Sequence, residues 1–318
     1  MKTTRYVALA SAGILALAFA APAVAQDEMD PGAAADSKLF VNMKGPGAGN
    51  PFWAAVEKGA VEAGEAYGVD VTVLAPPTES DVTAQIAQIE DAVVQGAAGI
   101  ALAPTDPAAL APAVDDAIAA GVQIVFVDSG GSNEGVTFIG TNNEVGAALA
   151  GQYLCDNVAE GAKVAILQGI ISTTTGILRA DGGRASVIEC GLDLVAELPA
   201  NWDTPMGQAV TEDILTQHPD LAGMFASNDN MALGAVEAFR AQDLLDQVTL
   251  VGFDANPNAA EAILAGEMEA TIAQNPYNMG WLGVESLIKL INGETLDAVI
   301  DTGTVLVDAS NAAEFVGS

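Results

Sequence analysis

Nine polar or aromatic side chains follow the ends of predicted β-strands, at seven places along the chain. They are Asn50 with Phe52 and Trp53, Asp128, Arg179, Trp202, Asn228, Asp254 and Gln274. A single Asp after a strand usually caps a helix, but helix capping does not explain seven such places in one chain. Carboxylates and amides exchange hydrogen bonds with hydroxyl groups, arginine offers a fixed fork of donors, and flat rings cover apolar C–H faces. The set therefore favours capture of a neutral polyhydroxy ligand.

The stretch that positions the first of these residues is segment 45–53, which reads GPGAGNPFW. An apolar run predicts a buried strand over 39–43, and apolar residues at helical spacing predict a helix over 52–67. The segment thus lies at the carboxyl end of a strand, where open α/β sheets bind ligands. Its glycines match neither a dinucleotide fingerprint nor a Walker loop, so a nucleotide site is not favoured. A role for Phe52 and Trp53 in merely capping the core stays open.

The chain alternates between strand and helix patterns, which predicts parallel sheets with helices on both faces. In the first half we expect strands at 39–43, 69–74, 99–103, 123–127 and 136–139. In the second half we expect strands at 164–167, 192–198, 223–226, 248–253, 270–273 and 304–307. Helices are expected there at 145–158, 184–190, 210–216, 230–240, 257–265 and 279–291. Two similar α/β halves therefore share the C-terminal tail, and Arg179 is expected in a threonine-rich loop.

The start of the chain has the pattern of an export signal. Residues 1–25 combine a basic start, an apolar stretch over 6–20 and the small-residue cleavage site Ala23-Val24-Ala25, as in a secretory signal peptide. Residues 26–37 are acidic and rich in Ala and Gly, which predicts a mobile leader. No Cys follows the cleavage site and no later apolar run is long enough for a span, so we expect neither a lipid anchor nor membrane insertion.

Length and charge narrow the classes of protein further. With 318 residues the chain is long enough for two domains that each bury a core. The formal net charge of -32 repels a phosphate backbone, so nucleic-acid binding is excluded. We interpret the charge as a solvated acidic surface that keeps an exported protein soluble.

The chain contains only two cysteines and one histidine. Cys155 and Cys190 fall near the ends of helices that flank the strand 164–167, and the compartment is oxidising, so one structural disulfide or two buried thiols fit. His218 beside a proline is expected at a helix C-terminus. A lone histidine gives little for a Ser-His-Asp triad or a metal site, so we expect no metal and no cofactor.

Seven segments together resemble the periplasmic sugar-binding proteins of the ribose-binding type, a solute-binding family of ABC transporters. They are GNPFW at 49–53, APTD at 103–106, VD at 127–128, LQG at 167–169, FASNDNMALGA at 225–235, VGFD at 251–254 and ATIAQ at 270–274. The similarity runs from about Leu39 to Val307, which is nearly the whole of the expected mature chain.

The resemblance implies a type I periplasmic binding fold of class α/β, with two Rossmann-like lobes whose parallel sheets are flanked by helices and joined by a three-strand hinge. It implies an N-terminal lobe of 38–139 plus 275–303 and a C-terminal lobe of 140–274 plus 304–318. It also implies a periplasmic monomer of a Gram-negative bacterium that closes on a monosaccharide or sugar alcohol and delivers it to the permease of an ABC importer. The nine side chains named above are then its ligand contacts.

Two departures from the ribose-binding pattern bear on the ligand. Ribose binders carry Arg where this chain has Ser129, and Asn where it has Ala103. Because two hydrogen-bonding groups are missing, ribose itself is not expected. The loop before Asn50 is longer and carries Lys44, which we expect to replace the lost Arg at the ligand; a solvent-facing Lys44 is the alternative.

Three other functions share parts of this pattern. A sensor would present a sugar-like signal to a chemoreceptor or a receptor kinase. A glycosidase would use Asp128 and Asp254 as paired carboxylates, but Arg179, Asn228 and the rings suit capture better than turnover. A sugar-responsive transcription regulator needs a DNA-binding segment at the start, where this chain has its signal sequence. We therefore expect a solute-binding protein and not an enzyme.

Overall fold

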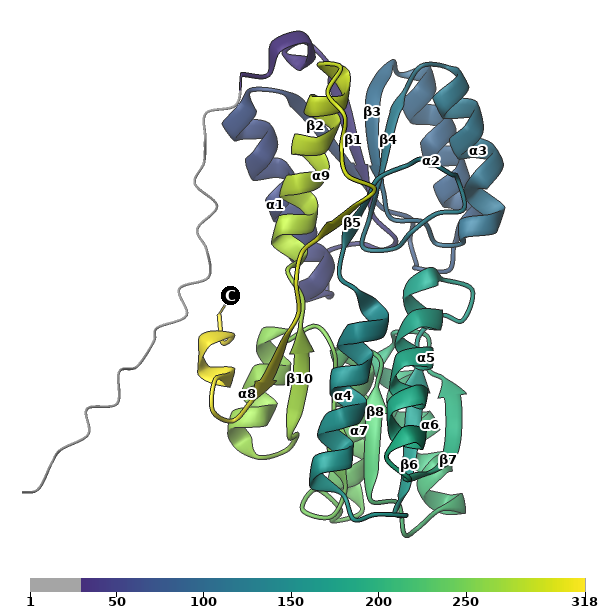
Figure 1. Ribbon diagram of the computed structural model, residues 1–318, viewed down its shortest axis with the longest axis vertical. Coiled ribbons are helices and arrows are strands. Elements are labelled where there is room, and N and C mark those ends of the chain that lie inside the picture. Colours follow the sequence, from purple (N-terminus) through teal and green to yellow (C-terminus); the bar gives the residue numbers. More distant parts are fainter. Residues whose placement is uncertain (1–29, 318) are drawn as a thin grey trace, which may run out of the picture. The chain divides into compact units, whose positions relative to one another are not determined.

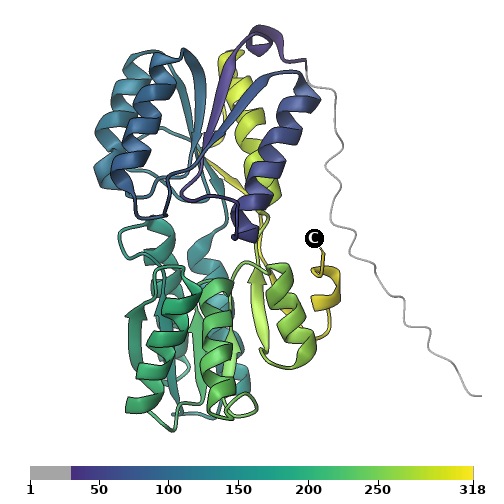
Figure 2. The ribbon, with the colours of Figure 1, turned by 180° about the vertical axis from the view of Figure 1, so that it is seen from behind.

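The computed structural model describes residues 30–317, which contain two six-stranded sheets (Figure 1). The first sheet is wholly parallel and has the order β11-β5-β4-β3-β1-β2. Its strands are β1 (Lys38–Asn42), β2 (Asp70–Leu74), β3 (Ala97–Leu102), β4 (Gln123–Val127), β5 (Phe138–Gly140) and β11 (Val299–Asp301). Helices α1 (Pro51–Tyr67) and α9 (Pro276–Ile291) cover one face, and α2 (Val82–Val94) and α3 (Pro107–Ala119) cover the other (Figures 1 and 2). We call this sheet with its four helices the first lobe.

The second sheet has the order β12-β10-β9-β8-β6-β7 and repeats the same plan. Its strands are β6 (Lys163–Gln168), β7 (Asp193–Pro199), β8 (Gly223–Ala226), β9 (Thr249–Val251), β10 (Ala270–Ala273) and β12 (Val305–Asp308). The last of these runs antiparallel to β10. Helices α4 (Asn143–Asn157) and α5 (Thr174–Glu189) pack on one face, and α6 (Thr204–Gln217), α7 (Asp229–Ala241) and α8 (Pro257–Ala265) pack on the other. This sheet with its five helices is the second lobe.

The chain crosses between the two sheets three times. The crossings join β5 to α4, β10 to α9, and β11 to β12. The predicted class, two helix-covered α/β lobes connected by three crossings, is confirmed, whereas the exact domain boundaries stay a prediction. Strand β11 was not expected, because its three residues alternate between exposed and half-buried and so leave no apolar run in the sequence.

Two helices begin well before their predicted starts. Helix α5 begins at Thr174 and not near 184, and α6 begins at Thr204 and not at 210. Glycines in both helices weaken the sequence signal because glycine is a poor helix former. Tertiary packing requires them: a Cβ on Gly182 would lie 2.3 Å from the carbonyl oxygen of Glu144 in α4, and one on Gly207 2.6 Å from that of Met231 in α7.

The disulfide between Cys155 and Cys190 is present and ties the end of α4 to the end of α5, with 6.0 Å between the two Cα atoms. The alternative of two buried thiols is therefore wrong. His218 caps the C-terminus of α6 as expected.

The start of the described chain is anchored on the first lobe. Gly32–Ala34 forms a single 3-10 turn, Ala34 is buried, and the backbone N–H of Ala33 donates to Asn292 Oδ1 at 2.8 Å. The predicted signal peptide and the first residues of the predicted leader lie outside the described residues. Within 30–317, none of the helices combines the length and the apolar composition that a membrane span requires.

Candidate functional site

A cavity between the two sheets collects all ten side chains that the sequence singled out. Its empty space, counting the part open to solvent, is about 290 Å³, which is small for a ligand pocket. The lining residues are Lys44, Asn50, Phe52, Trp53, Glu79, Asp128, Thr175, Arg179, Trp202, Asn228, Asp254 and Gln274. Only Glu79 and Thr175 were not expected. We call this hollow the inner cavity.

Three of the lining residues have a backbone conformation that side chains other than glycine rarely adopt. Asp128, Trp202 and Asp254 follow strand ends with φ angles of 60°, 65° and 123°. Such strain persists only where the surroundings hold the residue in place, and it concentrates at functional sites. The bend after each strand therefore turns these side chains toward the cavity instead of continuing the strand. Gly169 provides room for Trp202, because a Cβ there would lie 1.9 Å from the indole ring.

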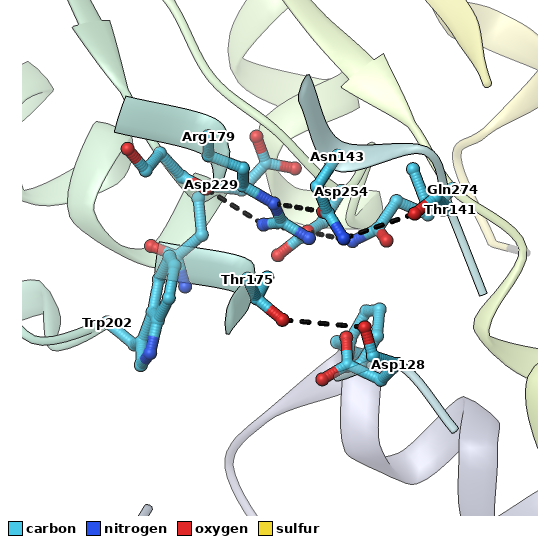
Figure 3. A network of polar contacts seen from close by, with 12 residues as sticks. Asp128, Thr141, Asn143, Thr175, Arg179, Trp202, Asp229, Asp254 and Gln274 are labelled. Atoms are coloured by element: carbon cyan, nitrogen blue, oxygen red, sulfur yellow. Dashed lines mark hydrogen bonds and ion pairs between the residues drawn. The ribbon is translucent and has the colours of Figure 1, made fainter. Parts of the chain in front are cut away.

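Arg179 lies inside helix α5, so its predicted place in a loop is wrong (Figure 3). The side chain is buried, and its Nε donates to Asn143 Oδ1 at 2.8 Å. One terminal nitrogen donates to the carbonyl oxygen of Ser227 at 2.8 Å and lies 3.3 Å from Asp254 Oδ1. Burial lowers the pKa of Arg179, but the carboxylates of Asp254 and Asp128 oppose that shift. Arg179 is thus a fixed positive charge at the wall of the second lobe.

Lys44 pairs with Asp128 inside the first lobe. Its Nζ lies 2.8 Å from Asp128 Oδ2, and both side chains are 3% exposed. The same nitrogen lies 5.7 Å from the ring centre of Trp53 and 5.9 Å from that of Trp202. The alternative of a solvent-facing Lys44 is therefore wrong, and the lysine stands at the cavity between two indole rings.

Glu79 is a lining residue that sequence reasoning missed. Its Oε1 accepts hydrogen bonds from Trp53 Nε1 at 2.8 Å and from Asn50 Nδ2 at 3.3 Å. Burial raises the pKa of Glu79, while Lys44 and the bond from Trp53 oppose the rise. The residue lies five positions past the end of β2, and its place beyond a strand end was the one signal that pointed to it.

Asp254 and Gln274 meet at the wall of the second lobe. Gln274 Nε2 donates to Asp254 Oδ1 at 2.6 Å, the same oxygen that faces Arg179. Burial raises the pKa of Asp254 to about 7, against the opposing effects of Arg179 and the bond from Gln274. This carboxyl group therefore changes charge near neutral pH in the ligand-free protein.

Asp229 does not line the cavity but holds the turn that carries Asp254. It is fully buried; Oδ1 accepts from Thr271 Oγ1 at 2.6 Å, and Oδ2 accepts from the backbone N–H of Asn256 at 2.7 Å. These bonds hold the turn in which Asp254 and Ala255 have positive φ angles. Burial, and then the neighbouring Asp254, raises the pKa of Asp229. Nothing in the sequence distinguishes Asp229, because aspartate is common at the start of a helix.

Two threonines at the start of α5 connect the lobes. Thr175 Oγ1 donates to Ser129 Oγ at 2.8 Å, and Thr174 Oγ1 donates to the carbonyl oxygen of Gly130 at 2.9 Å. Figure 3 shows Thr175 reaching from its helix toward the Asp128 backbone. The structure thus joins both lobes around the cavity by hydrogen bonds.

Apart from Asp128 Oδ2, which has the Lys44 ammonium as its ionic partner, two polar atoms of the lining are buried and lack a hydrogen-bond partner among the described residues. They are the donor Trp202 Nε1 and the acceptor Gln274 Oε1. Buried polar atoms almost always have partners, and each one left without costs roughly 1–3 kcal/mol. A ligand with hydroxyl groups offers the missing partners, so the lining fits a polyhydroxy molecule.

The two aromatic residues with which the first lobe lines the cavity, Phe52 and Trp53, also form part of the core. The rings of Phe52 and Trp53 meet edge to face with their centres 5.0 Å apart, and both residues are at most 6% exposed. They line the cavity as well, so core packing and ligand contact are compatible roles. Asn50 and Asn228 likewise serve twice, since each side chain caps a helix by accepting from the backbone N–H of Phe52 or Met231.

A family model, related sequences and solved structures all place this chain among periplasmic binding proteins. A periplasmic binding protein domain model matches residues 43–295. The ribose import binding protein of Escherichia coli (strain K12) is 34% identical over 250 residues, which are 78% of this chain and 83% of that protein. A solute-binding protein from Agrobacterium radiobacter in complex with D-arabinose superposes with a TM-score of 0.83 at 30% identity, covering 88% of this chain and 96% of that one. The Caulobacter myo-inositol binding protein superposes with a TM-score of 0.81 at 30% identity, covering 87% and 95%.

Proposed function

The chain belongs to the periplasmic binding protein family, to its ribose-binding type, and on that premise we propose that it captures a monosaccharide or sugar alcohol for an ABC importer. The observation that carries the proposal is the convergence of ten dispersed side chains on one small cavity between the lobes. The relatives bind ribose, D-arabinose or myo-inositol by their descriptions, all of which are small, neutral and rich in hydroxyl groups.

The side chains of the inner cavity divide the work of recognition. We assign the stacking surface to Phe52, Trp53 and Trp202, whose rings cover the apolar C–H faces of a sugar. Hydrogen bonds to the hydroxyl groups come from the amides of Asn50, Asn228 and Gln274. The charged groups of the two ion pairs, Lys44 with Asp128 and Arg179 with Asp254, form charge-assisted hydrogen bonds with further hydroxyl groups. We infer that Lys44, which pairs with Asp128, partly replaces the Arg that ribose binders carry after the strand-end Asp, and that the hydroxyl pattern selected differs from that of ribose.

Transport by this mechanism depends on closure. A ligand that touches both lobes binds the closed form better than the open one, so it shifts the population toward closure. The hydrogen bonds from Thr174 and Thr175 to the other lobe are the kind of contact that closure completes. The permease of the importer then recognises the closed, loaded protein, and the export signal predicted over 1–25 directs the chain to the periplasm.

Capture without chemical change is the activity we propose. Its nearest chemical rival is hydrolysis by Asp128 and Asp254. Lys44 and Arg179 each pair with one of these two side chains, and the amides and rings around them suit the capture of a sugar better than its hydrolysis. Incubation with candidate sugars followed by chromatography tests this point, and we expect every sugar to be recovered unchanged.

A ligand screen tests the proposed function directly. Purified mature protein is heated with pentoses, hexoses, polyols and inositols, and the melting temperature is recorded. A ligand that binds only the folded form raises the melting temperature with its concentration. We expect a rise with at least one neutral monosaccharide or polyol and a single site by calorimetry. Absence of any rise, together with binding of amino acids or other non-sugar solutes, contradicts the proposal.

The binding of that ligand is also expected to depend on Arg179. Arg179→Met removes the donors that hold Asp254 and Asn143, so we expect loss of measurable binding. Arg240→Met is the matched control, because Arg240 forms ion pairs with Glu237 and Glu267 at a partly exposed site and does not line the cavity. Equal affinity of both variants would remove Arg179 from the site.

A further inference from the structure

A second hollow lies beside the inner cavity. It is lined by the loop 45–50, by residues 78–80 after β2, and by the segment 201–206 that leads into α6. Ile170 and Asn230 complete the lining. Its empty space, counting the part open to solvent, is about 1160 Å³, against about 290 Å³ for the inner cavity. We call it the outer groove.

The outer groove and the inner cavity share a wall of side chains. Asn50, Glu79 and Trp202 line both hollows. Trp202 is 6% exposed, and its Nε1 donor has no hydrogen-bond partner within residues 30–317. The two hollows therefore form neighbouring parts of one ligand-binding region.

The loop 45–49 keeps the groove open because it carries no side chain larger than proline. Gly45 is required by packing, since a Cβ there would lie 2.8 Å from Glu79 Cγ. Gly49 has a φ of +81°, which favours glycine for conformational reasons. Ala48 is exposed and lies in the lining between them. None of these small residues lines the inner cavity, whereas Gly45, Ala48 and Gly49 line the groove.

The charges and polar groups of the groove lining indicate which kind of ligand group fits there. Its charged residues are Glu79 and Asp203, and neither Lys nor Arg lines it. Asp203 also caps α6, accepting the backbone N–H of Met206 at 2.8 Å. Hydroxyl and amide groups of residues such as Thr78, Ser80 and Asn201 stand among apolar surfaces, which is the mixture that a sugar ring needs. A phosphate or uronate would meet only negative charge, so the groove suits a neutral group.

We propose that the outer groove is a second subsite, which takes the neutral glycosyl unit of a disaccharide or glycoside whose first ring fills the inner cavity. This inference rests on the proposed function of the inner cavity and deepens it. It assigns to the protein a larger class of solute than single-ring sugars.

Calorimetry with paired probes tests the second subsite. The pairs are myo-inositol with galactinol, D-glucose with maltose, and D-galactose with lactose and with melibiose. We expect at least one two-ring probe to bind as tightly as its single-ring partner or more tightly. Each probe is titrated into the wild-type protein and into two variants that add an indole ring to the surface.

The variant Ala48→Trp fills the groove, and Ala119→Trp is its control because Ala119 is an exposed residue of α3 outside both hollows. We expect Ala48→Trp to lower the affinity for the two-ring probe by at least about tenfold, which corresponds to the loss of roughly two hydrogen bonds. The affinity for the single-ring partner should not change. Ala119→Trp should leave both probes unchanged.

The other outcomes separate the two proposals. If single-ring sugars bind and no two-ring probe does, the second subsite is refuted and the proposed function stands. If Ala48→Trp lowers the affinity for both members of a pair equally, the subsite is also refuted, because the substitution then disturbs the inner cavity and not a separate contact with the second ring. Failure of every sugar to bind refutes both proposals together.

Discussion

Single residues bring charge into a cavity that must also accept a neutral guest. Lys44 with Asp128 and Arg179 with Asp254 form ion pairs whose side chains are at most 6% exposed. Removing charges from water is costly, so such pairs persist only with close geometry and further hydrogen bonds. Each pair therefore holds its partners in place before the ligand arrives, which reduces the ordering that binding has to supply.

The substitution Lys44→Met tests the ion pair with Asp128. It leaves a buried carboxylate without its cation, which costs about 3–5 kcal/mol in the free energy of unfolding. Lys163→Met is the matched control, because Lys163 forms a 2.8 Å pair with Asp220 whose side chains are 35% and 64% exposed. We expect the control to lose at most about 1 kcal/mol. Urea denaturation measures both, and equal small losses would contradict the buried pair.

Asp254 makes ligand binding depend on pH. Its pKa in the ligand-free protein is raised to about 7 by burial, with Arg179, Gln274, Asp128 and Glu79 as the neighbouring groups. Hydroxyl donors of a bound sugar favour the carboxylate and so lower this pKa. Binding then releases protons, and the affinity should increase as pH rises from about 6 to 8. Calorimetry in buffers of different ionisation enthalpy detects the release, and uptake of protons on binding would have the wrong sign.

The same raised pKa gives the opposite trend for the stability of the ligand-free protein. The protonated form is favoured in the folded state, so this stability is fully present below the unfolded pKa of about 4 and is lost as pH rises through about 7. Asp254→Asn removes the titration, and both trends with pH should flatten in that variant.

At the scale of elements, close contacts between helices decide where the lobes' faces lie. Helices α1 and α9 approach at glycines: a Cβ on Gly59 would lie 2.0 Å from the carbonyl oxygen of Tyr277, and one on Gly280 2.0 Å from that of Val56. Helix α9 comes late in the sequence, so this contact joins the last third of the chain to α1. It fixes α1, whose N-terminus presents Asn50, Phe52 and Trp53.

Two glycines in one helix test how close this approach must be. In α9, Gly280 faces backbone, whereas a Cβ on Gly283 would lie 3.1 Å from a methyl group of Val127. Alanine improves helix propensity equally at both, by about 1 kcal/mol. We expect Gly280→Ala to destabilise the protein by about 1–3 kcal/mol net of that gain, and Gly283→Ala to be near neutral. Thermal and urea unfolding compare them, and equal stabilities would mean that α1 and α9 can move apart freely.

At the scale of the whole described molecule, two lobes act as one binding unit because hydrogen bonds cross between them. Thr174 does not line the inner cavity, yet its hydroxyl donates to Gly130 of the first lobe at 2.9 Å. It is therefore a contact that favours closure without touching the ligand. Closure energy and ligand affinity are coupled, because the apparent affinity falls with the fraction of closed, competent protein.

Thr174→Val measures that coupling. Loss of one hydrogen bond of roughly 0.5–1.5 kcal/mol should weaken ligand affinity by about 2- to 10-fold through a smaller closed population. Thr216→Val is the control, since its hydroxyl donates within α6 to the carbonyl oxygen of Glu212. Calorimetry gives the affinity, and small-angle scattering gives the compaction on binding. An unchanged affinity in Thr174→Val would show that this bond does not contribute to closure.

The sequence by itself determined most of the elements and the chemistry of the site. Alternating patterns predicted the two α/β lobes, and strand ends predicted nine lining residues, because buried parallel strands are continuous apolar runs and their carboxyl ends face one edge. These signals are local, so they are legible without a structure. The Cys155–Cys190 pair was also left as one of two options by local reasoning alone.

Tertiary structure alone decided which groups touch. The burial of Lys44 against Asp128, the support of Asp254 by Asp229, and the hydrogen bonds of Glu79 join residues from different elements. The early starts of α5 and α6 were missed because both helices contain glycines. Neighbouring helices pack so closely there that only glycine fits, whereas local propensity predicts no helix where glycine occurs. Periodicity reports which side of its own element a residue faces, whereas a pairing depends on the distance to another element, and only folding sets that distance.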